Sequence, residues 1–107
     1  MDQLIQRLED IMEADKPYLN PELKSAELAQ LLGISTHEFS RLINQHLGKS
    51  FSDFINEYRV LEAKDLLVSN SNYTLEAIGN QAGFNSKSAF YKAFKKFQGT
   101  TPGQFKA

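Results

Sequence analysis

The sequence has no cysteine, no tryptophan and only three prolines in 107 residues. Without cysteine the chain can form neither a disulfide framework nor a thiolate metal site, which fits a reducing compartment, so we expect a cytoplasmic protein. It also lacks the run of about 18 apolar residues that a membrane-spanning helix needs. No segment alternates apolar and polar residues with the period of a half-buried strand. These absences favour an all-helical fold.

The residue groups that catalysis requires are missing as well. An enzyme needs a nucleophile with its base, paired carboxylates or metal ligands. The two histidines, His37 and His46, are nine residues apart in one expected helix, which places them on different sides of it. Ser40 follows His37 by three positions, but nothing nearby would orient the imidazole or form an oxyanion hole. We therefore expect no enzymatic activity, no metal and no cofactor.

The charges that are present are unevenly distributed along the chain. The formal net charge is −1, although nucleic-acid binders are usually basic. Residues 1–34 carry three basic and seven acidic side chains, whereas residues 69–107 carry five lysines and a single acid, Glu76. The C-terminal third is therefore the part of the chain best suited to contact phosphates.

Apolar residues recur at helical spacing through most of the chain. Together with capping residues and glycines they predict helices over residues 2–15, 25–32, 35–47, 50–68, 75–82 and 85–97, a turn at 69–72 and a last helical turn at Pro102. Ser35 and Glu38 have the spacing of a capping box, and Asn85 is expected to cap the helix that follows it. One apolar stripe is expected on the 50–68 helix, made of Phe51, Phe54, Ile55, Tyr58, Leu61 and Leu66.

The two halves of the chain resemble each other. Residues 23–33 align with residues 73–83. The second half then has one extra residue, after which a second set of positions aligns between the two halves. In that set Phe39, Arg41, Gly48 and Phe54 align with Phe90, Lys92, Gly99 and Phe105. Each half thus predicts a short helix, a glycine turn and a second helix, which is the pattern of a helix-turn-helix unit. From spacing alone, two ordinary helical hairpins remain an alternative.

Specific residues make residues 20–106 resemble the AraC/XylS-type transcription regulators. The signature lies in Ala77–Phe105, in Tyr58-Arg59, Ala63 and Leu66-Leu67, and in Leu28-Ala29, Leu32-Gly33-Ile34-Ser35, Phe39 and Gly48. The resemblance implies a homeodomain-like all-α domain of about seven helices spanning residues 1–107, with subdomains over about 1–49 and 69–107 and a linker helix over about 50–68. It also implies that two recognition helices enter successive major grooves of double-stranded DNA, and that the chain is part of a longer regulator.

In the second unit, the resemblance places Lys87, Ser88, Ala89 and Lys92 toward the groove. Lysine can donate to guanine O6 and N7, and the alanine methyl group can pack on a thymine methyl group. Further along the same helix, Lys95 and Lys96 are expected at phosphates, which position a protein without specifying sequence. The alternative is a solvated lysine face with no DNA partner.

In the first unit, the corresponding positions are Thr36, His37, Ser40, Arg41 and Asn44. The planar fork of Arg41 matches guanine O6 and N7 and makes it the strongest candidate for base contact. Gln45 is placed near the DNA backbone. The alternative of an ordinary surface carries more weight here, because Glu38 would repel phosphate if it pointed outward.

Two further points are left open by the sequence. Arg59 could reach a phosphate or pair with Glu62 or another acid. Gly79 stands where relatives often have alanine, and it is expected to weaken its helix by roughly 1 kcal/mol.

The function expected from these residues is that of a sequence-specific DNA-binding domain of a transcription regulator. The competing hypothesis is a helical protein-interaction module that keeps the fold but does not bind DNA, with acidic residues 1–22 docking a protein. RNA polymerase or a sensor or dimerisation domain of the same chain could be a further partner under either hypothesis.

Overall fold

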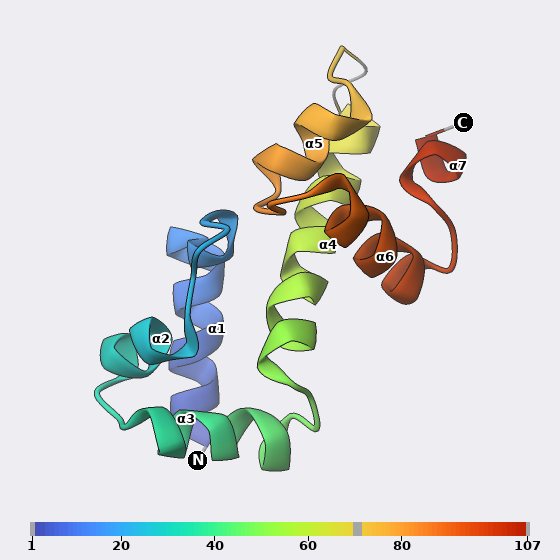
Figure 1. Cartoon of the computed structure of the whole chain (residues 1–107). Coiled ribbons are helices and arrows are strands. Elements are labelled where there is room, and N and C mark those ends of the chain that lie inside the picture. Colours follow the sequence, from blue (N-terminus) through green and yellow to red (C-terminus); the bar gives the residue numbers. More distant parts are fainter. Residues whose placement is uncertain (1, 70–71, 107) are drawn as a thin grey trace. The chain divides into compact units, whose positions relative to one another are not determined.

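A computed structural model describes residues 2–69 and 72–106, and every regular element in those residues is helical (Figure 1). The elements are α1 (Asp2–Asp15), the 3₁₀ turn η1 (Pro17–Leu19), α2 (Ser25–Leu32), α3 (Thr36–Arg41), the π-helical turn η2 (Leu42–His46), α4 (Phe51–Ser69), α5 (Leu75–Gln81), α6 (Lys87–Gln98) and α7 (Pro102–Lys106). The expected all-α class of about seven helices is confirmed. The turn expected at 69–72 includes residues 70 and 71, which lie outside the described residues.

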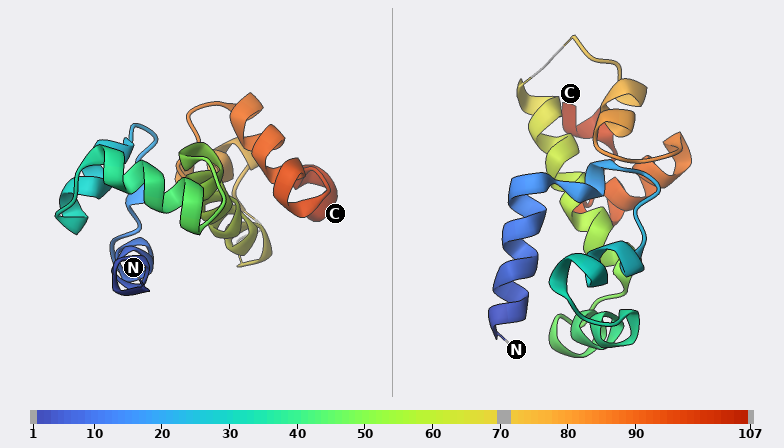
Figure 2. Two further views of the ribbon diagram at one scale, coloured as in Figure 1. Left: turned by 90° about the horizontal axis from the view of Figure 1, so that it is seen from below. Right: turned by 90° about the vertical axis from the view of Figure 1, so that its left-hand side faces the viewer.

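The chain divides into two compact units, one ending at Phe54 and the other beginning at Ile55, so the division falls within α4. In the N-terminal unit, α1 is amphipathic and buries Leu8 and Met12 completely. Leu28, Phe39 and Ile43 from α2, α3 and η2 are also buried in this unit, as are Ala29, Leu32 and Leu42. Figure 2 shows from two further sides that a short turn joins α2 to α3.

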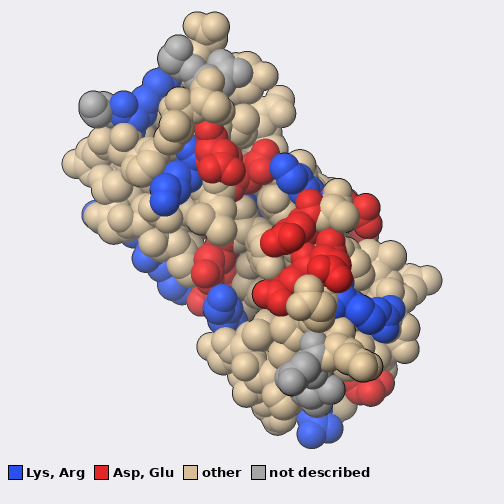
Figure 3. Space-filling model, turned by 180° about the vertical axis from the view of Figure 1, so that it is seen from behind, with Lys and Arg blue, Asp and Glu red and all other residues tan. Residues whose placement is uncertain are grey.

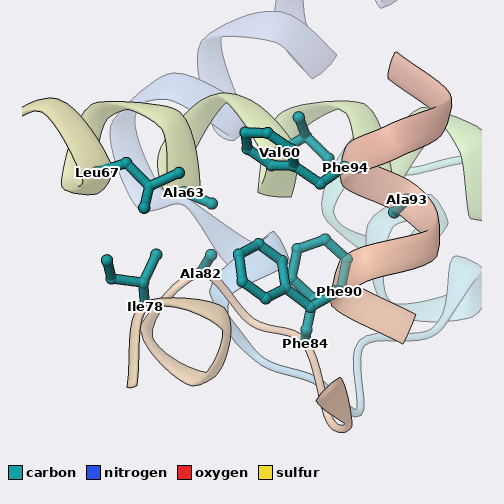
Figure 4. Packing of buried hydrophobic residues seen from close by; sticks show 9 residues of the cluster. All are labelled: Val60, Ala63, Leu67, Ile78, Ala82, Phe84, Phe90, Ala93 and Phe94. Carbon is teal, nitrogen blue, oxygen red and sulfur yellow. The ribbon is translucent and has the colours of Figure 1, made fainter. Parts of the chain in front are cut away.

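The C-terminal unit has a core of aliphatic side chains packed around three phenylalanine rings (Figure 4). Its buried members are Val60, Ala63 and Leu67 from α4, Ile78 and Ala82 from α5, Phe84 from the turn, and Phe90, Ala93 and Phe94 from α6. The centroid of the Phe94 ring lies 5.9 Å from that of Phe90 and 5.5 Å from that of Phe105, in both cases edge to face. Such pairs add about 0.5–1.5 kcal/mol each beyond the burial of their area. The rings thus hold α6 and α7 in the unit.

The single apolar stripe expected on the 50–68 helix is wrong at Leu61, which is 49% exposed. Phe54 and Ile55 are buried as expected, but in the second half of α4 the buried residues are Val60, Ala63 and Leu67. At about 100° per residue, these three point to a different side of the helix from Phe54 and Ile55. The stripe fails because the buried residues of α4 do not keep to one side of the helix over its whole length.

Candidate nucleic-acid interface

The turn between α2 and α3 is closed by a pair of backbone hydrogen bonds. Gly33 adopts the left-handed conformation, with φ of 72°. Its N–H donates to the Gln30 carbonyl at 3.0 Å, and the N–H of Ile34 donates to the Ala29 carbonyl at 3.1 Å. This is the Schellman arrangement, in which glycine avoids the strain that a Cβ would cause at positive φ. The turn therefore ends α2 sharply and starts the chain toward α3.

The turn between α5 and α6 repeats these bonds fifty residues later. Gly83 has φ of 100°, its N–H donates to the Asn80 carbonyl at 3.1 Å, and the N–H of Phe84 donates to the Gly79 carbonyl at 3.0 Å. The internal repeat found in the sequence is thus a repeat of backbone geometry. Each unit contains two helices joined by a short glycine turn, and the second helix of such a unit is the one that enters the major groove.

A capping box begins α3, as expected. The Ser35 Oγ accepts the Glu38 N–H at 3.0 Å, and the Glu38 carboxylate accepts the Ser35 N–H at 3.1 Å. The hydrogen bond from the Ser35 backbone N–H, followed by one from the Ser35 side chain, lowers the pKa of the Glu38 carboxyl. The carboxylate is therefore tied back to the first turn of α3, which is where a negative charge stabilises a helix.

The cap of α6 is Ser86, so the expectation that Asn85 caps this helix is wrong. Ser86 has the extended backbone of a capping residue, and its Oγ accepts the Ala89 N–H at 3.0 Å. Ser86 aligns with Ser35 once the extra residue of the repeat is counted. That extra residue therefore lies in the turn between α5 and α6 and leaves the recognition helix itself in register.

The N-terminal unit gathers its expected DNA-contacting residues on the exposed side of α3 and η2. Thr36, His37, Arg41 and Asn44 are exposed and Ser40 is partly exposed. The opposite side, formed by Phe39, Leu42 and Ile43, is buried. One feature was not expected: after Arg41 the helix continues as a π-helical turn over Leu42–His46.

The C-terminal unit has its expected DNA-contacting residues on the exposed side of α6, which remains α-helical to Gln98. Lys87, Ser88, Lys92, Lys95 and Lys96 are exposed and Ala89 is partly exposed, whereas Phe90, Ala93 and Phe94 on the opposite side are buried. The Lys87 Nζ lies 5.4 Å from the centroid of the Tyr91 ring, which holds this cation near the start of the helix. The sequence of α6 contains no acid, so its lysines form a strongly basic surface within this unit.

Figure 3 shows one face of the molecule, on which acidic side chains gather with lysines and arginines among them. In the N-terminal unit, α1 exposes Glu9, Asp10, Glu13 and Asp15. The uneven charge that the sequence predicts is therefore a property of the folded surface as well.

Arg59 lies in the C-terminal unit, beside the glycine turn. It is half-buried, and the loss of hydrating water lowers the pKa of its guanidinium. Its Cζ lies 6.0 Å from the centroid of the Phe84 ring. Sequence reasoning considered a phosphate and an acid as its partners and missed this aromatic ring, which only the fold brings within reach.

A small hollow of about 140 Å³ lies beside the first recognition helix. Its lining consists of Leu4, Ile34, Glu38, Arg41, Leu42, Gln45 and His46. In residues 2–69 and 72–106, no group of three or more histidine or acidic side chains could hold a metal ion. No helix in those ranges is long and apolar enough to cross a membrane.

Known proteins resemble this chain over most of its length. A family model described as a helix-turn-helix domain matches residues 28–107. An uncharacterized HTH-type transcriptional regulator of Staphylococcus aureus is 32% identical over 83% of this chain, and the arabinose operon regulatory protein of Escherichia coli is 33% identical over 77% of it. The chain spans only 12% and 28% of the length of these two relatives.

The fold has close counterparts among solved structures. The crystal structure of an AraC-type transcriptional regulator from Chromobacterium violaceum superposes with a TM-score of 0.83 at 26% identity, covering 98% of this chain and 90% of that one. The two glycine turns, the exposed polar sides of α3 and α6, and these likenesses agree with one another. The chain belongs to the helix-turn-helix family of AraC-type transcription regulators, in which it is a DNA-binding domain.

Proposed function

We propose that this domain binds a bipartite, non-palindromic DNA sequence, with α3 and η2 in one major groove and α6 in the next. Each recognition helix would contact one half of the site. The half contacted by α3 would depend on Thr36, His37, Ser40, Arg41 and Asn44, and the half contacted by α6 on Lys87, Ser88, Ala89 and Lys92. Lys95 and Lys96 would neutralise phosphates and contribute affinity rather than specificity.

The observation that carries this proposal is the repeat of one turn geometry with an exposed polar helix after it. In both units the side of the second helix that faces away from the core carries side chains able to donate hydrogen bonds to bases. A protein-interaction module would have no reason to place four lysines and no acid on α6. These lysines repel one another, and a polyanion would relieve that repulsion.

A selection from a randomised pool of duplex DNA tests the proposal. The domain is expected to enrich one motif with two separated blocks of preferred bases. Arg41→Ala should weaken preference in one block and Lys92→Ala in the other, each by about 1–3 kcal/mol at the affected position. Both residues are exposed, so neither substitution should disturb the core.

Three outcomes would contradict the proposal. No enriched motif at any salt concentration would favour the protein-interaction module. A motif with one block would mean that a single unit contacts bases. If Arg41→Ala and Lys92→Ala weaken binding to all sequences alike, the two residues contact phosphates and the base-contacting roles are wrong.

We further propose that the domain acts in the cytoplasm, as a non-catalytic part of a longer regulator. The support is the small share of each relative's length that the chain covers. The exposed acids of α1 would then meet RNA polymerase or a sensor domain of the same chain. A pull-down tests this contact by comparing the wild-type protein with an α1 variant in which glutamine replaces Glu9, Asp10 and Glu13. Recovery of the polymerase or sensor domain in equal amounts by both proteins would contradict it.

A further inference from the structure

The two recognition helices differ in their backbone hydrogen bonding. α6 is α-helical over all of Lys87–Gln98. The first recognition helix is α-helical only over Thr36–Arg41 and then takes a π-helical turn over Leu42–His46. Both helices have the same length from their aligned phenylalanine to their terminal glycine, so the π turn is not the result of an inserted residue.

A π turn changes which side chains share a side of the helix. In an α-helix, residues three and four positions apart are neighbours, so Asn44 and Gln45 would both lie near Arg41, one on each side of the line from His37 to Arg41. A π turn closes its hydrogen bond over five residues instead of four, so each residue rotates the chain through a smaller angle. The π turn therefore brings Gln45, rather than Asn44, into line with the side chains of His37 and Arg41. Asn44 moves toward the side of Ser40.

The lining of the small hollow agrees with the placement of Gln45 beside Arg41. Arg41 and Gln45 both border the hollow of about 140 Å³, and Asn44 does not. Gln45 is exposed, as Arg41 is. The two side chains thus lie on one side of the helix and are both available to a ligand.

We propose that Gln45 contacts the base pair next to the one contacted by Arg41, and that it takes the role that α-helical spacing would give to Asn44. A glutamine amide matches adenine, since it can accept from N6 and donate to N7. The first half of the site then contains an A·T pair selected by Gln45. This inference rests on the proposed function, because it assigns one more base-contacting residue to the same DNA interface.

The test compares Gln45→Ala with Asn44→Ala in the selection from randomised duplex DNA. The two residues are adjacent, uncharged and exposed, so the substitutions are closely matched, and thermal unfolding verifies that both variants remain folded. Gln45→Ala should lose about tenfold of the preference for adenine at one position of the first block. Asn44→Ala should retain that preference and instead weaken preference at another position of the first block, because Asn44 lies toward the side of Ser40.

The other outcomes overturn the inference. If Asn44→Ala loses the adenine preference and Gln45→Ala retains it, the α-helical spacing holds in the complex. If both variants lose it equally, or neither does, the π turn does not determine the contact. These results leave the bipartite motif of the wild-type domain intact, whereas a wild-type domain that enriches no motif refutes the proposed function and this inference together.

Discussion

At the scale of single residues, Gly79 has a role that its helix propensity conceals. A Cβ built on Gly79 would lie 2.6 Å from Cδ2 and 2.9 Å from Cγ of Phe90. Phe90 is 1% exposed and packs among Phe84 and Phe94, so its ring has little room to move. Glycine at this position therefore permits the close approach of α5 to Phe90, and the expectation that it merely weakens α5 was incomplete.

Gly79→Ala is expected to destabilise the domain by about 1–2 kcal/mol, because an overpacking cost against Phe90 in the upper part of the usual range of about 1–3 kcal/mol outweighs the gain of about 1 kcal/mol in helix propensity. Urea unfolding followed by circular dichroism measures the difference in the free energy of unfolding. Gly103→Ala is the matched control, since its Cβ would lie 3.6 Å from Leu75 Cδ1, an ordinary contact distance. That variant should be as stable as the wild type or slightly more stable. Equal effects of the two substitutions would show that Phe90 can move aside.

At the scale of elements, the two recognition helices begin in different ways. Both have a serine cap, but only α3 has the second half of a capping box, supplied by Glu38. The carboxylate stabilises the start of α3 only while it is ionised. Ala89 occupies the corresponding position of α6, so the start of α6 has no such dependence on pH.

The stability of the domain should therefore fall in acid in part through Glu38. Because the pKa of Glu38 is lowered in the folded protein, its contribution is complete above the ordinary value of 4.5 and is lost as the pH falls through the lowered value. Glu38→Gln keeps a side-chain acceptor that does not titrate in this range. The urea midpoint of the Glu38→Gln variant should therefore decrease less steeply than that of the wild type between about pH 5 and about pH 3, because the variant has one fewer carboxyl group with a lowered pKa. Parallel pH profiles of the two proteins would contradict this role.

At the scale of the whole molecule, the net charge of −1 conceals two surfaces of opposite sign. We expect the basic side of α6 to attract DNA and the exposed acids of α1 to oppose nonspecific binding. We therefore expect weak binding to nonspecific DNA and a strong dependence of specific binding on salt. The logarithm of the association constant should fall by about 0.9 per phosphate neutralised for each tenfold rise in salt.

Replacing Lys95 and Lys96 together by alanine should reduce that salt slope by about 1.8, with little change in the selected motif. The salt slope is obtained by titrating a fluorescent duplex with the protein at several salt concentrations between about 50 and about 300 mM. Lys64→Ala removes a positive charge from α4 and serves as the control. A slope that changes no more in the double variant than in Lys64→Ala would place Lys95 and Lys96 away from the phosphates.

The local features of the fold could be predicted from the sequence because residues close along the chain determine them. The glycine turns at Gly33 and Gly83 require positive φ, the capping box of Ser35 and Glu38 spans four residues, and helical periodicity separates the buried from the exposed side of α6. The repeat of these signals was enough to predict two helix-turn-helix units and the exposed residues of each.

Other features depend on residues that meet only when the chain folds. Gly79 and Phe90 belong to different helices, so the close contact between them has no local signal. The buried side of α4 changes along its length, whereas periodicity analysis assumes a single side. The π turn after Arg41 likewise has no local signal, because Ala93 and Phe94 align with Leu42 and Ile43 and are buried too, yet α6 remains α-helical. Periodicity along the chain therefore determined which helices form and which side of α6 is buried, whereas packing between helices decided where that regularity fails, in α4 and at Gly79, because burial is a property of the assembled core.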